Sequence, residues 1–301
     1  MGGDFLGDWL KVLFALVVSW VCCVPSFAII RGQSIEGRRD FAAFVKVDFA
    51  NSSCSGTLIA SHLILTARHC LISDQNRGSR LPLTVRDIFN HTLVADTLNY
   101  QTLAPPVQFT HRVGNQRMPV YQPDIMVIRL LDAPAVAQLL KYPQAVIGPT
   151  QVPPAPNGTV TTFMVGIGSA SMDPRGGGYY NVASAYLRPL NQTPAPGPFN
   201  DPANSRQLFH TVNWTPAMSS SGYGSSQNGD SGGCLYRYDI RNKAILQLGV
   251  SSYTSSAVSV ATSVPVRTSY YVNLAYPPVQ AWLKAIWNAP SKLFHNPIPI
   301  Q

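Results

Sequence analysis

The stretch "SSQNGDSGGCLY", residues 225–236, places Ser231 between small turn residues, and Cys234 directly follows the glycine pair at 232–233. By average amino-acid usage, a string such as Gly-Asp-Ser-Gly-Gly (229–233) arises by chance in a chain of this size only about a few times in ten thousand. Glycines let the backbone turn sharply and aim N–H groups at one point, where they can stabilise an oxyanion beside the Ser231 hydroxyl. A glycine-rich hairpin turn is the plain alternative. Because a serine hydroxyl alone is a poor nucleophile, the functional interpretation requires a histidine and a carboxylate elsewhere in the chain.

His69 is the candidate base among the six histidines. It ends the buried-strand pattern "LILTARHC" (63–70) and is followed directly by Cys70, which can reach back to Cys54 in "SSCSGTLIA" (52–60). A disulfide closing this hairpin would contribute roughly 3 kcal/mol and would fix the backbone of the histidine. The alternative is a histidine with a structural role only.

Asp124 is the candidate carboxylate because it opens the apolar run "DIMVIRLL" (124–131). An aspartate at the mouth of a buried strand often only caps that strand. The presence of the other two segments favours a functional role.

The segments "CSGTLIASHLILTARHC" (54–70), "DIMVIRL" (124–130) and "NGDSGGC" (228–234) resemble, in that order, the signature segments of the chymotrypsin/trypsin-like serine protease family. The order His69, Asp124, Ser231 matches the triad order of this family and differs from that of subtilisins and α/β-hydrolases. Three shorter pieces also resemble the family: "IIRG" from Ile29, an activated amino terminus; "GIG" at 166–168, a segment of the second barrel; and "GVSS" at 249–252, the substrate-binding strand.

The resemblance spans nearly all of residues 29–288 and implies an all-β fold of two six-stranded antiparallel β-barrels. The sequence pattern also favours an all-β fold, because short apolar or alternating runs are interrupted throughout by Gly, Pro, Asn and Ser. One helix is expected in "PPVQAWLKAIWNA" (277–289), which carries Val279, Trp282, Ile286 and Trp287 on one face. The expected organisation is a signal peptide (1–28), a first barrel (29–146), a second barrel with the C-terminal helix (147–289) and a tail (290–301).

The resemblance implies a division of labour among the site residues. Ser231 is the nucleophile, His69 the general base and then the general acid, and Asp124 orients His69. The N–H groups of Gly229 and Ser231 form the oxyanion hole, and the ammonium of a terminus at Ile29 pairs with Asp230. No metal or cofactor is implied.

The function predicted is that of a secreted serine endopeptidase acting on protein or peptide substrates, with proteinaceous inhibitors as possible partners. One alternative is a catalytically silent binding protein of the same fold, and another is an esterase that uses the same triad.

The substrate pocket is expected around Ser225, Ser226, Ser251 and Tyr253. Ser225, six residues before the nucleophile, resembles the pocket-floor position, and because it is not an aspartate a trypsin-like preference for Lys or Arg is not expected. The prediction is a preference for uncharged residues. The chain also departs from the family pattern, which usually has other residues at Arg68, Ile167, Gln227, Cys234, Ser252 and Tyr253.

The cysteines predict a secreted protein with one internal bridge. Cys22 and Cys23 leave with the signal peptide, and the family-like placement of Cys54 and Cys70 pairs them as the only intramolecular disulfide. Cys234 is then a buried free thiol, or pairs with another molecule.

Composition places the chain among globular proteins, since 46% of its 301 residues are hydrophobic and 12% are charged. Lys11, the apolar run 12–24 and Ala28 form a secretory signal, with an uncleaved anchor as the alternative. After its removal no stable membrane association is expected. The formal net charge of +8 is scattered, which argues against nucleic-acid binding. Five glycosylation sequons, which agree with secretion, begin at Asn51, Asn90, Asn157, Asn191 and Asn213.

Overall fold

The computed structural model describes residue 29 and residues 32–49, 52–60, 63–70, 83–93, 95–102, 107–113, 116–130, 145–147, 162–167, 181–185, 208–221, 223–226, 229–239, 244–258 and 263–288. The expected signal peptide (1–28) and tail (290–301) lie outside these residues. So do Gln227 and three of the sequon asparagines, Asn51, Asn157 and Asn191.

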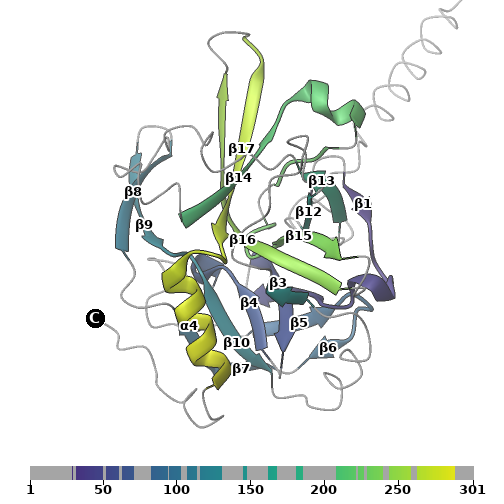
Figure 1. The fold of residues 1–301 in the computed structure, drawn as a ribbon, viewed down its shortest axis with the longest axis vertical. Coiled ribbons are helices and arrows are strands. Elements are labelled where there is room, and N and C mark those ends of the chain that lie inside the picture. The colour runs from purple at the N-terminus through teal and green to yellow at the C-terminus, as the bar shows by residue number, and fades with distance from the viewer. Residues whose placement is uncertain are drawn as a thin grey trace, which may run out of the picture.

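The first sheet occupies the lower half of the molecule in Figure 1. Its seven strands within the described residues run in the order β6 (Thr92–Leu93), β5 (Leu83–Asp87), β2 (Phe44–Phe49), β3 (Ser52–Ala60), β4 (Leu63–Thr66), β10 (Met126–Leu130) and β7 (Ala95–Thr102). All pairings are antiparallel. β4 is central and buried along its whole length, which is why its sequence "LILT" reads as a continuous apolar run.

The second sheet occupies the upper half of Figure 1. As described, it runs in the order β1 (Gln33–Ser34), β13 (Asn181–Ala185), β12 (Thr162–Gly166), β15 (Cys234–Asp239), β16 (Ala244–Val258), β17 (Pro265–Asn273) and β14 (Phe209–Trp214). β11 (Ala145–Ile147) is attached in parallel to β16. Setting aside the short edge strands β1, β6 and β11, six strands remain in each sheet. The expected two-barrel antiparallel fold is therefore confirmed.

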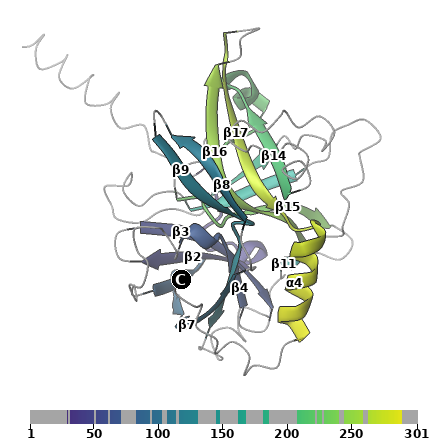
Figure 2. The same ribbon diagram turned by 90° about the vertical axis from the view of Figure 1, so that its left-hand side faces the viewer.

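Three further elements complete the described fold. A hairpin of β8 (Val107–Val113) and β9 (Gln116–Gln122) forms a separate two-stranded sheet. The expected C-terminal helix is present as α4 (Pro277–Asn288), and both views show it beside the first sheet although it follows β17 (Figure 1 and Figure 2). Val279 and Ile286 of the expected apolar face are buried, together with Leu283. Short 3-10 helices lie at Arg39–Phe41, Arg68–Cys70 and Pro216–Ser221.

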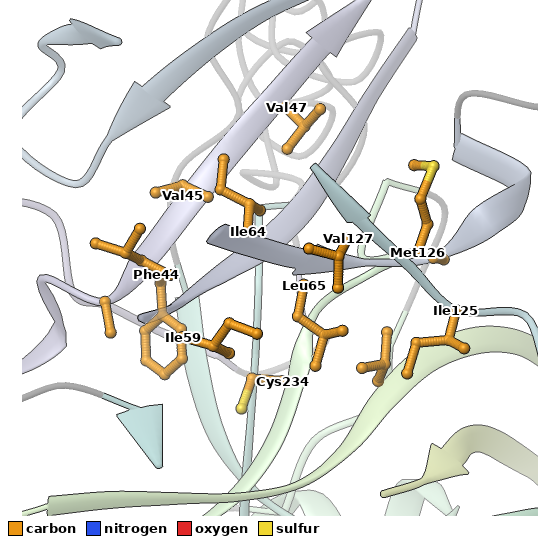
Figure 3. Close-up of a cluster of buried hydrophobic side chains, with 14 of the residues drawn as sticks. Phe44, Val45, Val47, Ile59, Ile64, Leu65, Ile125, Met126, Val127 and Cys234 are labelled. Carbon is orange, nitrogen blue, oxygen red and sulfur yellow. The ribbon is translucent and has the colours of Figure 1, made fainter. Parts of the chain in front are cut away.

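A shared hydrophobic core holds the two sheets together. Tyr236 of β15 packs its ring 5.7 Å from that of Phe44 in β2 and 5.5 Å from that of Phe163 in β12. Cys234, also on β15, is fully buried and lies close to Ile59 and Leu65 of the first sheet (Figure 3). The strand that follows the Gly-Asp-Ser-Gly-Gly turn thus runs along the interface between the sheets, so packing there positions the turn.

Candidate active site

The backbone of His69 is fixed by a disulfide. His69 lies in the 3-10 helix Arg68–Cys70 that follows β4, and the next residue, Cys70, is bonded to Cys54 of β3 across a Cα–Cα distance of 6.2 Å. This pairing confirms the prediction from the sequence, and among the described cysteines only Cys234 is free. The disulfide closes the β3–β4 hairpin and limits movement of His69.

Asp124 reaches His69 because of the register between two strands. β10 pairs with β4 so that Met126 lies opposite Thr66, which brings the residues just outside the two strands together. The two carboxylate oxygens of Asp124 accept hydrogen bonds from the His69 backbone N–H at 2.9 Å and from ring atom Nδ1 at 2.6 Å. The carboxylate is 4% exposed and the imidazole 45% exposed. The buried acid therefore orients an accessible ring and leaves Nε2 as the proton acceptor.

The two groups shift each other's pKa. Burial alone would lower the pKa of His69, but the charge of Asp124 and the hydrogen bond to it outweigh burial and raise that pKa above its ordinary value of 6.5. Burial alone would raise the pKa of Asp124, but the charge of His69 and hydrogen bonds from His69 and Ser252 outweigh burial and lower it. The pair thus favours a proton on His69 and a charge on Asp124, which is the state that a general base reaches after taking a proton.

Ser252 is a partner of Asp124 that the sequence analysis missed. Its hydroxyl donates to Asp124 Oδ2 at 2.6 Å from the second sheet. The β16–β17 register shifts between Ser251 and Tyr253, so a bulge at Ser252 turns this side chain out of the regular alternation.

The serine turn has the backbone shape that its glycines predict. Gly229 and Gly232 have positive φ angles, 90° and 79°, which favour glycine. At Gly232 a Cβ atom would also lie 2.1 Å from the Ser55 carbonyl oxygen, so the turn packs directly against β3. Within the described residues the N–H groups of Gly229 and Ser231 donate no hydrogen bond. They are the two donors expected for the oxyanion hole, and both are available to a ligand.

Backbone hydrogen bonds tie the turn to both other parts of the site. The Ser231 carbonyl accepts from the Ser55 N–H at 2.7 Å, next to the Cys54 that braces His69. The Gly232 N–H donates to the Ser251 carbonyl at 2.7 Å, next to the Ser252 that holds Asp124. The structure therefore brings the three predicted segments together, although within the described residues the Ser231 hydroxyl makes no hydrogen bond to His69. Such bonds are often long or poorly aligned before substrate binds.

Ser55 is a second residue to which the sequence analysis gave no role. Its hydroxyl donates to the Gly229 carbonyl at 3.2 Å and accepts from the Ile167 N–H at 3.1 Å, while the Thr66 hydroxyl donates to its carbonyl at 2.7 Å. One side chain of the first sheet thus satisfies two backbone groups of the second. No local sequence signal identifies this role, because the partners lie more than 100 positions away.

The expected pocket residues divide between the two faces of the second sheet. The Ser226 hydroxyl forms hydrogen bonds with the hydroxyl groups of Thr254, at 2.9 Å, and Ser269, at 2.6 Å. The adjacent residue Ser225 is also buried. Tyr253 directly precedes Thr254 in β16, and neighbouring residues of a strand face opposite sides of the sheet. Tyr253 accordingly pairs with Tyr270, while Thr254 pairs with Ser269. Its ring stacks on that of Tyr270 at 4.2 Å. The Tyr253 side chain therefore does not share the face on which Thr254 and Ser269 contact Ser226.

Ser251, the remaining expected pocket residue, is held mainly by its backbone. Its N–H donates to the Gly233 carbonyl at 2.8 Å, and its carbonyl accepts from Gly232. It lies opposite Tyr271 in β17. Ser251 therefore links the serine turn to strands β16 and β17.

Ile29 and Asp230 are both deeply buried, each 1% exposed. Ile29 packs in a cluster of the second barrel that includes Met164, Leu235 and Tyr271. The Asp230 carboxylate lies against Gly166, where a Cβ atom would approach Oδ1 to 2.2 Å. Burial and the negative charge of Asp230 both raise the pKa of Tyr271, which belongs to the same cluster as Ile29.

One group of possible metal ligands occurs among the described residues, formed by Cys54, His69 and Cys70. The two sulfur atoms are bonded to each other, so neither is a thiolate that could bind a metal. This group accordingly does not form a metal site.

Two sequon asparagines are described. Asn90 is exposed in a turn with a positive φ of 67°. Asn213 lies within β14, and its side-chain oxygen accepts a hydrogen bond from Thr268 at 3.1 Å. Of the two, Asn90 has the more accessible setting.

Comparison with known proteins decides the family. The family described as Trypsin matches residues 29–275, which include both sheets and all three candidate catalytic residues. The chain belongs to the trypsin family. Members of the trypsin family are peptidases, and their substrates are peptides or proteins.

The chain also matches solved structures. Of 327 matching chains, one comes from the "Structure of Glu endopeptidase in complex with MPD". It is 18% identical, has a TM-score of 0.48, and the match covers 84% of this chain and 97% of that one. No curated protein matches the chain. Among the residues that the structure describes, none of the helices has the length and apolar character needed to cross a bilayer.

Proposed function

We propose that this trypsin-family protein is a secreted serine endopeptidase that cleaves peptide bonds with Ser231, His69 and Asp124. The observation that carries the proposal is the pair formed by a buried carboxylate and an accessible imidazole, tied through neighbouring residues to the serine turn. Protein inhibitors that bind at the same three residues are proposed partners.

Each side chain has one part in the reaction. The Ser231 hydroxyl oxygen attacks the peptide carbonyl carbon while His69 Nε2 takes the hydroxyl proton. Asp124 accepts the Nδ1–H hydrogen bond and stabilises the imidazolium that forms. The N–H groups of Gly229 and Ser231 bind the negative oxygen of the tetrahedral intermediate. His69 then protonates the leaving amine, the C–N bond breaks, and water later hydrolyses the Ser231 ester by the same route.

Labelling with a fluorophosphonate probe tests the proposal. The secreted, folded protein should react at Ser231, and peptide mapping should find the adduct there. Ser231→Ala should remove labelling, and His69→Ala should slow it severely because the hydroxyl loses its base. Failure of the processed wild-type protein to label would support the catalytically silent alternative. Matched peptide and ester substrates separate an endopeptidase from an esterase.

We further propose that a single cut after Ala28 both removes the signal and activates the protease. That cut would give Ile29 an ammonium group, and its side chain already packs in the buried cluster that contains Leu235 and Tyr271. Pairing of the ammonium with Asp230 would offset the large penalty of burying each charge alone. Asp230 directly precedes Ser231, so this pairing would order the oxyanion turn.

Terminal sequencing of active, secreted protein tests the activation scheme. Ile29 should be the first residue. Another first residue, such as Asp40 after a cut at Arg38-Arg39, would reject the scheme. Full activity of a variant that retains extra residues before Ile29 would reject it as well.

A further inference from the structure

A charged side chain that the sequence analysis did not consider lies on the same face of the second sheet as the partners of Ser226, one of the expected pocket residues. Ser269 shares that face with Thr254, because the two are directly paired and both bond the Ser226 hydroxyl. Arg267 lies two residues before Ser269 in β17, and alternate residues of a strand share a face. Arg267 is therefore placed beside the serine-lined wall.

The contacts of Arg267 agree with this placement. Its Nη2 atom donates to the Ser226 carbonyl at 3.5 Å, a long and weak hydrogen bond. Its Nε atom is fully buried and has no hydrogen-bond partner among the described residues. No described carboxylate lies within 4 Å of it. The guanidinium has five N–H donors in a planar fork, and within the described structure it uses one of them.

The charge on this arginine is costly to leave without a close partner. Partial burial lowers the pKa of Arg267, and the more distant negative charge of Asp230 opposes that effect. An arginine remains protonated at neutral pH even so. A partly desolvated cation with unused donors attracts a carboxylate, which a guanidinium binds through two parallel hydrogen bonds. The hydroxyl groups around Ser226 add polar partners to the same wall.

We propose that Arg267 determines specificity and that the protease cleaves after Asp or Glu. The inference rests on the proposed function, and it replaces the sequence-based expectation of a preference for uncharged residues. Lys and Arg remain excluded, since their side chains would meet a like charge at Arg267. An acidic side chain would supply the carboxylate that the described pocket lacks.

Paired peptide substrates test the inference in the protein with its native terminus. Two peptides that differ only by Glu or Gln before the scissile bond are compared by kcat/KM. We expect the Glu peptide to be preferred by about a hundredfold or more, because the Gln isostere leaves the guanidinium unneutralised. Arg267→Gln should reduce the ratio to within about fivefold, and Arg267→Lys should retain an intermediate ratio because the charge remains without the fork.

Controls separate this inference from the proposed function. Arg86→Gln removes an arginine of the first sheet whose guanidinium lies 3.8 Å from Asp48, and it should leave the ratio unchanged. Fluorophosphonate labelling of each variant shows whether the catalytic serine still reacts. A labelled wild-type protein without a preference for Glu over Gln would overturn the inference while the proposed function stands. A preference that survives in a labelled Arg267→Gln variant would overturn it too.

Discussion

The Ser55 hydroxyl offers a sharp test of how the two sheets position the oxyanion turn. Ser55→Ala removes the hydroxyl group that donates a hydrogen bond to the Gly229 carbonyl and accepts one from the Ile167 N–H. It leaves in place the backbone hydrogen bond from Ser55 to the Ser231 carbonyl. The perturbation therefore acts on the Gly229 peptide and spares the main-chain tie to the nucleophile.

The expected losses of stability and activity follow from the two backbone groups, the Gly229 carbonyl and the Ile167 N–H, that lose their hydrogen-bond partner. At about 1–2 kcal/mol for each, Ser55→Ala should lower the free energy of unfolding by roughly 2–4 kcal/mol and the melting temperature by about 5–10 °C. Complete loss of an oxyanion donor costs about 10²–10³ in kcat. The Gly229 carbonyl belongs to the Gly229–Asp230 peptide, whereas the Gly229 N–H belongs to the preceding peptide. Release of the carbonyl therefore shifts that donor only indirectly, and we expect kcat to fall roughly tenfold with little change in KM.

Steady-state kinetics and thermal unfolding provide the assay, and Ser53→Ala provides the matched control. Ser53 lies two residues away on β3, and its hydroxyl donates to Asp48 at 2.5 Å, away from the site. The control should lose stability while its kcat remains unchanged. Equal kcat values for the two variants would refute the claim that Ser55 positions the oxyanion turn.

Three further predictions concern residues around the site. Activity should fall as pH drops through the raised pKa of His69, so the midpoint of kcat/KM against pH should lie above 6.5, since the base must be neutral. Ser252→Ala should lower kcat/KM about tenfold by removing a hydrogen bond to the charged Asp124, and a loss of less than twofold would argue against this role. The buried Cys234 thiol, whose pKa burial raises well above 9.0, should resist iodoacetamide in the folded protein and react after denaturation.

Features encoded by adjacent residues could be predicted from the sequence. The apolar run of β4 followed by His69, the turn glycines around Ser231 and the apolar face of α4 depend on local pattern and backbone shape. The Cys54–Cys70 disulfide also closes a short hairpin. For the strand, the turn and the helix the information is local, whereas the pairing of the two cysteines was predicted from the resemblance to the family.

Features that depend on strand register could not be predicted. Ser252 reaches Asp124 because of a bulge, and that bulge moves Tyr253 onto Tyr270 and away from the Ser226 face. Arg267 reaches Ser226 from a strand 41 positions later in the sequence. Side chains alternate between faces with a period of two, so an error of one residue in register exchanges pocket and core positions.

Adjacent residues of one strand connect the base to the nucleophile. Cys54 of β3 is bonded to Cys70 and so holds the backbone beside His69, while Ser55 binds the Ser231 carbonyl and the Gly229 carbonyl. Side chains of neighbouring strand residues face opposite sides, so the Cys54 sulfur and the Ser55 hydroxyl act from the two faces of β3. Over this stretch β3 is paired with β2, Cys54 opposite Val47 and Ser55 opposite Lys46, and this pairing restrains the backbone between the two anchors. β3 therefore links the candidate base to the candidate nucleophile, even though the two residues belong to different sheets.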